Sequence, residues 1–159
     1  MRKGQAALEF LTTYGWAFLV ILVMIGALAY FGVLNPKNFL PSRCTFSPEI
    51  DCLEARMDAP PLNLMQFRFR NNVGSTADFN ASAVYVGPTL APNSTCFNSS
   101  GGFSINLAPG RAGEFRCFFS AAQPLPKDDK AKFEVTVIFK KSDGSFWNPA
   151  KGEIYGTVN

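Results

Sequence analysis

The residues that most often carry enzyme chemistry are scarce in this chain. Its 159 residues include no histidine, which excludes Ser-His-Asp and Cys-His catalysis and metal sites with histidine ligands. The acidic clusters have simpler explanations: Asp128-Asp129 lies between two lysines, as a solvated turn would, and no recognised ligand loop surrounds Asp51 and Glu54. Glycine-rich phosphate-binding motifs are also absent from the sequence. We therefore expect no enzyme activity, no metal and no cofactor.

The four cysteines are the next residues with chemical potential. Cys44, Cys52, Cys96 and Cys117 all follow a long apolar block, and they could form two disulfides, a metal site or four buried thiols. None belongs to the C-x-x-C pair typical of zinc or redox motifs. If the apolar block places the rest of the chain outside the cell, disulfides are expected. Of the three possible connectivities we favour Cys44–Cys52 with Cys96–Cys117, because each closes a short loop.

Three N-x-Ser/Thr sequences offer sites for glycosylation, at Asn80, Asn93 and Asn98. Asn93 and Asn98 fall in a polar segment, residues 91–102, which we expect to be an exposed loop. Asn80 alternates with Phe79 and should face outward on a strand. Chance alone supplies about one such sequence, so the excess favours a glycoprotein.

A single carboxylate, Glu9, stands at the entrance of a segment without charges, from Phe10 to Pro36. A helix over Ala6–Leu34 would be about 44 Å long, against about 30 Å for the hydrocarbon core of a bilayer. An unpaired charge at this position is costly in a membrane or in a protein core. Arg2 and Lys3 predict that the start of the segment is cytoplasmic and that the remainder of the chain is extracellular.

This segment has three interpretations. A plain membrane anchor explains the hydrophobicity but leaves Glu9 unexplained. A secretory signal peptide could be cut after Ala29, although the apolar block continues for five residues past that point. In the third interpretation the cut lies between Gly4 and Gln5, before the apolar block, and the helix is kept.

The third interpretation rests on Lys3-Gly4-Gln5 followed by Glu9. This pattern resembles the class III signal peptide, K-G-Q-x-x-x-E, of archaeal type IV-like pilins. The resemblance implies that a prepilin peptidase recognises Lys3, Gly4 and Gln5 and removes residues 1–4. It also implies an assembly role for Glu9, the fifth residue of the mature chain, which would neutralise the α-amino group of a neighbouring subunit and set the axial register. The alternative is that Glu9 merely lies at headgroup level, and cyclisation of an amino-terminal Gln5 would remove the partner charge.

After Pro36 the pattern changes to the alternation of β-strands. Residues 65–70 and 132–140 alternate cleanly, and weaker candidates are residues 79–86, 103–107, 114–119 and 153–158. We expect an α+β chain in which a long hydrophobic α-helix precedes a small, immunoglobulin-like antiparallel β-sandwich head. Most phenylalanines of this head should point into its core. The expected divisions are residues 1–4, a removed leader; 5–36, a transmembrane and filament-core helix; 37–62, a disulfide-stapled connector; and 63–159, the head.

The function that we expect is structural. By the resemblance, the chain is a pilin, a subunit of an extracellular type IV-like adhesive pilus, and a single-pass membrane protein before assembly. Its implied partners are identical subunits, the prepilin peptidase, an assembly ATPase and a membrane platform protein. A nucleic-acid partner is not expected, because the net charge is only +3 and no basic patch stands out. The alternatives are a membrane-anchored extracellular binding module that does not polymerise and a secreted domain released after Ala29.

Overall fold

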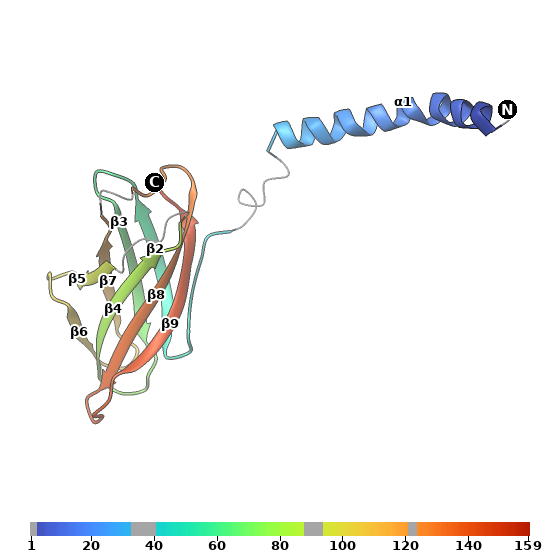
Figure 1. The fold of residues 1–159 in the computed structure, drawn as a ribbon. Coiled ribbons are helices and arrows are strands. Elements are labelled where there is room, and N and C mark those ends of the chain that lie inside the picture. The colour runs from blue at the N-terminus through green and yellow to red at the C-terminus, as the bar shows by residue number, and fades with distance from the viewer. Residues whose placement is uncertain (1–2, 33–40, 88–93, 121–123) are drawn as a thin grey trace. The chain divides into compact units, whose positions relative to one another are not determined.

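The computed structural model describes residues 3–32, 41–87, 94–120 and 124–159. The chain divides into two compact units, Met1–Leu40 and Pro41–Asn159. Within the described residues, the first unit consists of a helix and the second, which we call the head, consists of strands and their connections (Figure 1).

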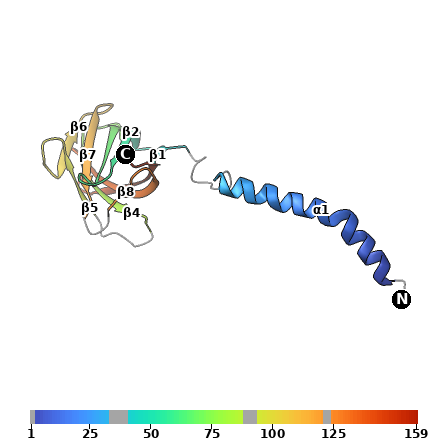
Figure 2. The same cartoon turned by 90° about the horizontal axis from the view of Figure 1, so that it is seen from above.

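Helix α1 spans Lys3–Tyr30 and is built almost entirely from apolar residues with good helix propensity. It ends with a glycine cap: Phe31 and Gly32 donate backbone hydrogen bonds to Ala27 and Ala29, and Gly32 has a φ of 70°. The helix bends toward its amino-terminal end (Figure 2). The expected helix reached Leu34, which lies outside the described residues.

Nine antiparallel strands make up the described part of the head. The clean alternation predicted at residues 65–70 and 132–140 is present, and so are the four weaker candidates, with shifted ends. Three further strands, at residues 43–46, 50–58 and 94–98, were not predicted. The strands are β1 (Arg43–Phe46), β2 (Ile50–Asp58), β3 (Leu64–Asn71), β4 (Ala77–Tyr85), β5 (Ser94–Asn98), β6 (Ser104–Leu107), β7 (Ala112–Phe118), β8 (Lys130–Lys141) and β9 (Asn148–Thr157).

The strands follow one another in a single sheet rather than in two separate sheets. Their order is β1-β9-β8-β4-β5-β7-β3-β2, and β6 pairs with β4 beside β5. β5 makes the sheet continuous, because it pairs with β4 through Ser94 and Thr95 and with β7 through Cys96 to Asn98. The sheet curls into a nearly closed barrel (Figure 1). The expected two-sheet, immunoglobulin-like sandwich is therefore not confirmed.

The barrel closes where the two end strands, β1 and β2, meet. These strands are joined by a short turn and by the disulfide Cys44–Cys52. At the other end of β2, the backbone of Asn159 donates to Met57 and accepts from Ala59. Residues 43–46 and 50–58 are thus part of the head and not of the connector that we expected at 37–62. Strand β2 was not predictable from alternation, because a register shift between Cys52 and Glu54 interrupts its pattern.

The core of the head is aromatic. Phe67, Phe69, Phe79, Phe115 and Phe133 are all at most 1% exposed. The rings of Phe69 and Phe115 stack with their centroids 5.6 Å apart, and Phe79 meets Phe69 edge-on at 5.2 Å. Each of these side chains lies on the inward side of a strand, as its alternation predicts.

Candidate functional site

Helix α1 exposes an apolar surface that nothing in the described part of the chain covers. Its residues 12–30 are long and apolar enough to cross a membrane, and none of that stretch is buried. The exposed side chains lie all round the helix, so the surface is not the single stripe of a helix that packs on its own domain. The large ones are Leu8, Phe10, Tyr14, Trp16, Phe18, Leu19, Val20, Ile21, Leu22, Val23, Met24, Ile25, Leu28 and Tyr30.

Glu9 lies at the start of this surface, one turn after Gln5. Its side chain is exposed, and among the described residues no cation forms an ion pair with it. Its carbonyl oxygen accepts hydrogen bonds from the hydroxyls of Thr12 at 3.0 Å and Thr13 at 2.8 Å. Such bonds back to the preceding turn satisfy the hydroxyls within the helix and favour bending. The carboxylate of Glu9 is therefore a charge that no described residue of this helix neutralises.

The residues of the expected processing site begin the helix. α1 starts at Lys3, so the backbone of Gly4 and Gln5 belongs to its first turn. The side chains of these residues lie outside the described part of the structure, and their recognition by a peptidase stays a prediction.

The four cysteines form Cys44–Cys52 and Cys96–Cys117, the sequential pairing favoured above, and none is free. Cys96 and Cys117 face each other across β5 and β7 and are fully buried. Two disulfides and an apolar amino-terminal helix indicate a secreted or surface protein. The helix could serve as its membrane anchor.

The three expected glycosylation sites differ in their surroundings. Asn93 lies outside the described residues. Asn98 ends β5 and is half-buried; its Nδ2 donates to the Ser104 carbonyl at 2.6 Å, and its Oδ1 accepts from Ser100 and Gly102. Asn80 lies opposite Ser104 in the ladder of β4 and β6 and is also half-buried. Neither Asn80 nor Asn98 is as open as the sequence suggested.

Charged side chains on the outer face of β2, β3 and β7 pair with one another. Arg68 lies 3.4 Å from Glu54, and Arg70 lies 3.8 Å from Asp51. Asp51 and Glu54, considered above as cation ligands, are therefore already paired with arginines. Among the described residues, no three His, Cys, Asp or Glu side chains gather as metal ligands would.

A second group of ion pairs crosses β1, β9 and β8. Glu153 lies 2.9 Å from Lys132 and 3.5 Å from Arg43. The hydrogen bond and charge of Lys132 lower the pKa of Glu153, with a smaller contribution from Arg43. Burial, and to a lesser extent Asp129, raise the pKa of Tyr85. The two ion pairs of Glu153 link β9 to its neighbours β8 and β1.

The head also exposes aromatic side chains, although the strand pattern predicts most of its phenylalanines in the core. Phe103 is 59% exposed and Phe118 51%, and both approach the half-buried Phe97, with ring centroids 4.9 and 6.3 Å from it. Phe146, in the turn between β8 and β9, is 81% exposed. Phe97 and Phe118 alternate with buried cysteines, so their outward direction was readable from the strand period.

No family model matches the sequence, and no curated protein is significantly similar to it. Several solved structures resemble the fold at low scores, among them the following three. The archaeal flagellum of Methanospirillum hungatei strain JF1 has a TM-score of 0.41 and 14% identity, over 100% of this chain and 94% of the other. A chain of the CsuC–CsuE chaperone–tip adhesion subunit complex from the archaic chaperone-usher Csu pili of Acinetobacter baumannii has a TM-score of 0.39 and 11% identity, over 74% of this chain and 52% of the other. The putative ApaA protein of Bordetella pertussis has a TM-score of 0.34 and 16% identity, over 74% and 95%. Similarities at this level do not define a family.

Proposed function

We propose that this chain is a filament subunit of the archaeal type IV-like pilin class. The observation that carries the proposal is the contrast between its two units: the head buries its own aromatic core, whereas the candidate span of α1 buries none of its surface. Covering a large apolar side chain is worth about 1.5–3 kcal/mol. A helix with such a surface on every side is therefore stable only in lipid or inside a bundle of helices.

The amino-terminal motif supports a helix that is used in both environments. Lys3-Gly4-Gln5 precedes the apolar surface, so a prepilin peptidase that cuts between Gly4 and Gln5 removes a short basic leader and leaves the helix intact. The helices then leave the bilayer and form the core of the filament. An assembly ATPase and a membrane platform protein supply the energy and the scaffold for that transfer.

Glu9 supports an ordered polymer over a simple anchor. Its carboxylate has no ion-pair partner among the described residues, and it lies one helical turn from the proposed new amino terminus at Gln5. In a helical bundle, the α-amino group of a neighbouring subunit would compensate the buried charge. The carboxylate and the α-amino group can meet at only one axial displacement between neighbouring helices. Their pairing would therefore set the register of the subunits.

The head is the extracellular part of the subunit in this proposal. Its two disulfides suit an oxidising environment, and glycans at Asn80, Asn93 or Asn98 would lie on the outer sheath of the filament. The heads of such an adhesive pilus supply the surface that meets other cells or materials. The chain itself performs no catalysis.

Electron microscopy of filaments sheared from cells, with mass spectrometry of their subunits, tests this function. We expect thin filaments that contain this chain and a mature mass that begins at Gln5. A mature chain that begins at Tyr30 would identify a secreted domain instead. If the protein is recovered only from detergent-extracted membranes and never from filaments, it is a membrane-anchored module and the proposal is wrong.

A further inference from the structure

The polar side chains near the start of α1 differ in whether the helix itself satisfies them. The hydroxyls of Thr12 and Thr13 donate to backbone carbonyls one turn earlier, at 2.8 to 3.0 Å. A hydroxyl that donates to the backbone in this way does not leave an unsatisfied donor when it is placed in hydrocarbon. Thr12 and Thr13 can therefore enter a bilayer at low cost.

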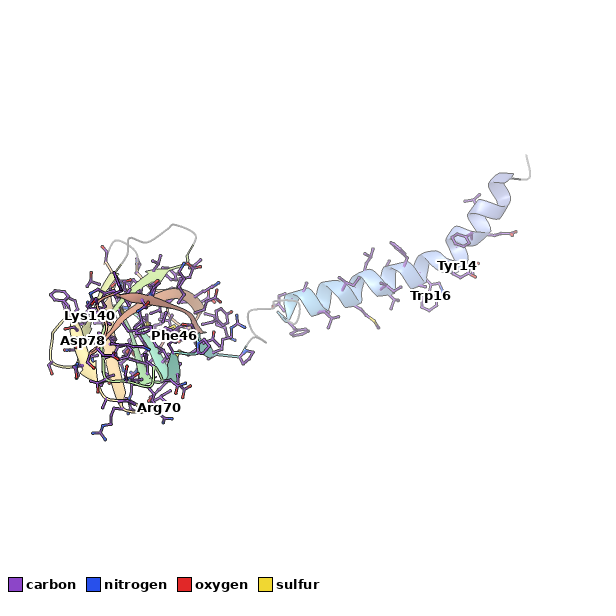
Figure 3. The ribbon with its side chains drawn as sticks, turned by 90° about the horizontal axis from the view of Figure 1, so that it is seen from below. Tyr14, Trp16, Phe46, Arg70, Asp78 and Lys140 are labelled. Atoms are coloured by element: carbon purple, nitrogen blue, oxygen red, sulfur yellow. A yellow bond between two sulfur atoms is a disulfide. The ribbon has the colours of Figure 1, made fainter. Side chains whose placement is uncertain are left out.

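Tyr14 and Trp16 have no such internal partner. Their side chains are 57% and 68% exposed, and among the described residues nothing accepts a hydrogen bond from the tyrosine hydroxyl or the indole N–H. Both side chains extend away from the helix (Figure 3). Tyrosine and tryptophan with an apolar ring and a wet polar tip are favoured at the boundary between hydrocarbon and headgroups.

The other end of the span carries a matching pair. Residues 17–29 contain no side chain that donates or accepts a hydrogen bond apart from weak sulfur contacts. They are followed by Tyr30, which is 87% exposed, and Phe31, which is 76% exposed, with ring centroids 5.6 Å apart. Tyr14 and Tyr30 are about 24 Å apart along the axis at 1.5 Å per residue. That spacing is within a few ångström of the thickness of the hydrocarbon core, about 30 Å.

The two aromatic residues at the amino-terminal end point in different directions around the helix. Trp16 follows Tyr14 by two residues, which is a rotation of about 200°. Phe10, in turn, packs on Tyr14 on the same side, with ring centroids 4.7 Å apart. Aromatic rings on opposite sides of a helix hold that helix at one depth in the interface, whichever way it is rotated about its axis. An aromatic patch on one side only would instead favour a helix that lies flat on the membrane surface.

We propose that Tyr14 and Trp16 hold α1 at one lipid interface, and Tyr30 and Phe31 at the other, in the membrane-inserted stage of the proposed function on which this inference rests. The lipid headgroup region is thus the partner of these side chains. Glu9 lies five residues before Tyr14, about 7.5 Å further out, so it is hydrated while the subunit is in the membrane. Its charge becomes costly only when the helix enters a filament, which is where a partner is needed.

Fluorescence quenching by brominated lipids measures the depth of Trp16 directly. The full-length chain with Trp147→Phe, in which Trp16 is the one remaining tryptophan, is reconstituted in phosphatidylcholine vesicles that carry bromine either near the headgroup end or near the methyl end of the acyl chains. We expect shallow bromine to quench about twofold more than deep bromine. The matched control moves the tryptophan to mid-span, with Trp16→Phe, Trp147→Phe and Val23→Trp, and should show the opposite order. Deeper quenching of Trp16 would overturn the proposal.

Thiol labelling in the same vesicles tests the position of Glu9. All four native cysteines are in disulfides, so Glu9→Cys and Val23→Cys each introduce one reactive thiol. We expect a polar maleimide, supplied on both sides of the vesicles, to label Glu9→Cys fully and Val23→Cys hardly at all. Equal protection of both would overturn the proposal. Neither measurement depends on polymerisation, so a failure to form filaments in cells would not change their results. A chain that does not co-float with the vesicles in a density gradient would contradict both this inference and the membrane stage of the proposed function.

Discussion

The ring of Phe46 lies directly against the backbone of Gly152, on the space that a β-carbon at residue 152 would occupy. The two residues are partners in the ladder between β1 and β9. From this position the ring also stacks on Phe67 of the core, with centroids 5.6 Å apart. Phe46 therefore links the end strand β1 to the interior of the barrel, and the absence of a side chain at Gly152 makes room for it.

Gly152→Ala should destabilise the head, because the added methyl group displaces the Phe46 ring from its contact with Phe67. We expect a loss of about 1–3 kcal/mol, typical of overpacking, measured by thermal or denaturant unfolding of residues 41–159 within the full chain. Gly144→Ala is the matched control, since its β-carbon would make only ordinary contacts with Lys141. Equal stability of the two variants would show that the ring moves aside freely.

The two disulfides should contribute unequally to stability. They close loops with sequence separations of 8 and 21 residues, for which chain entropy gives about 2.5 and 3.3 kcal/mol. Cys96 and Cys117 are also fully buried, so their replacement by alanine leaves a gap in the core. We expect Cys96→Ala with Cys117→Ala to lower the midpoint of unfolding more than Cys44→Ala with Cys52→Ala. The reverse order would mean that closure at β1 and β2 controls the stability of the head.

Asn63→Ala should be strongly destabilising although the residue lies outside any strand. Asn63 is 5% exposed; its Nδ2 donates to the carbonyls of Phe119 and Ser120, and its Oδ1 accepts from Leu125. Removing the amide leaves these backbone groups without that partner, at a cost of about 2–4 kcal/mol. Calorimetry of Asn63→Ala against Asn106→Ala, an exposed asparagine with one hydrogen bond to Asp78, checks this. A similar small effect in both variants would contradict the structural role.

The sequence predicts the elements of this fold better than their assembly. The apolar run and the alternation of residues 65–70 and 132–140 come from local periodicity, and α1, β3 and β8 follow them. β5 is missed because Ser94 and Thr95 resemble a polar loop; what makes it a strand is the tertiary pairing of Cys96 with Cys117. That same pairing joins the two halves of the sheet, so the barrel was not predictable from alternation alone.

The candidate site divides in the same way. Glu9 was recognisable from the sequence, because a single charged residue next to a long apolar run stands out in the amino-acid pattern itself. The hydrogen bonds of Thr12 and Thr13 became visible only with side chains in place. The same is true of Tyr14 and Trp16, for whose polar atoms no described residue is a partner. The engagement of Asn98 by its own loop is likewise a three-dimensional property, which the pattern N-x-Ser does not contain.

The ion pairs of Glu153 predict a pH dependence of the head. Since its pKa is lowered in the folded state from a reference of 4.5, its stabilising contribution is present above that pH and is lost as the pH falls through the lower, folded value. Glu153→Gln should therefore lower the melting temperature slightly at neutral pH, and the difference from the unmodified protein should close in acid and shrink in high salt. Glu134→Gln, directly opposite on β8, removes a like charge and should not destabilise. A difference that persists unchanged at low pH would exclude the ion pairs as its cause.

Glu9→Ala should allow processing but impair filament assembly. The carboxylate has no ion-pair partner among the described residues, so its removal costs the isolated subunit little, and the peptidase motif Lys3-Gly4-Gln5 is intact. In the assembled bundle, however, the α-amino group of the neighbour would lose its counter-charge, and a buried unpaired charge costs about 3–5 kcal/mol. We expect mature subunits that begin at Gln5 to accumulate in the membrane while the yield of sheared filaments falls sharply. Glu114→Ala, on the outer face of the head, is the control and should leave the yield unchanged. Normal filaments from Glu9→Ala would show that the register is set by the apolar packing of α1 alone.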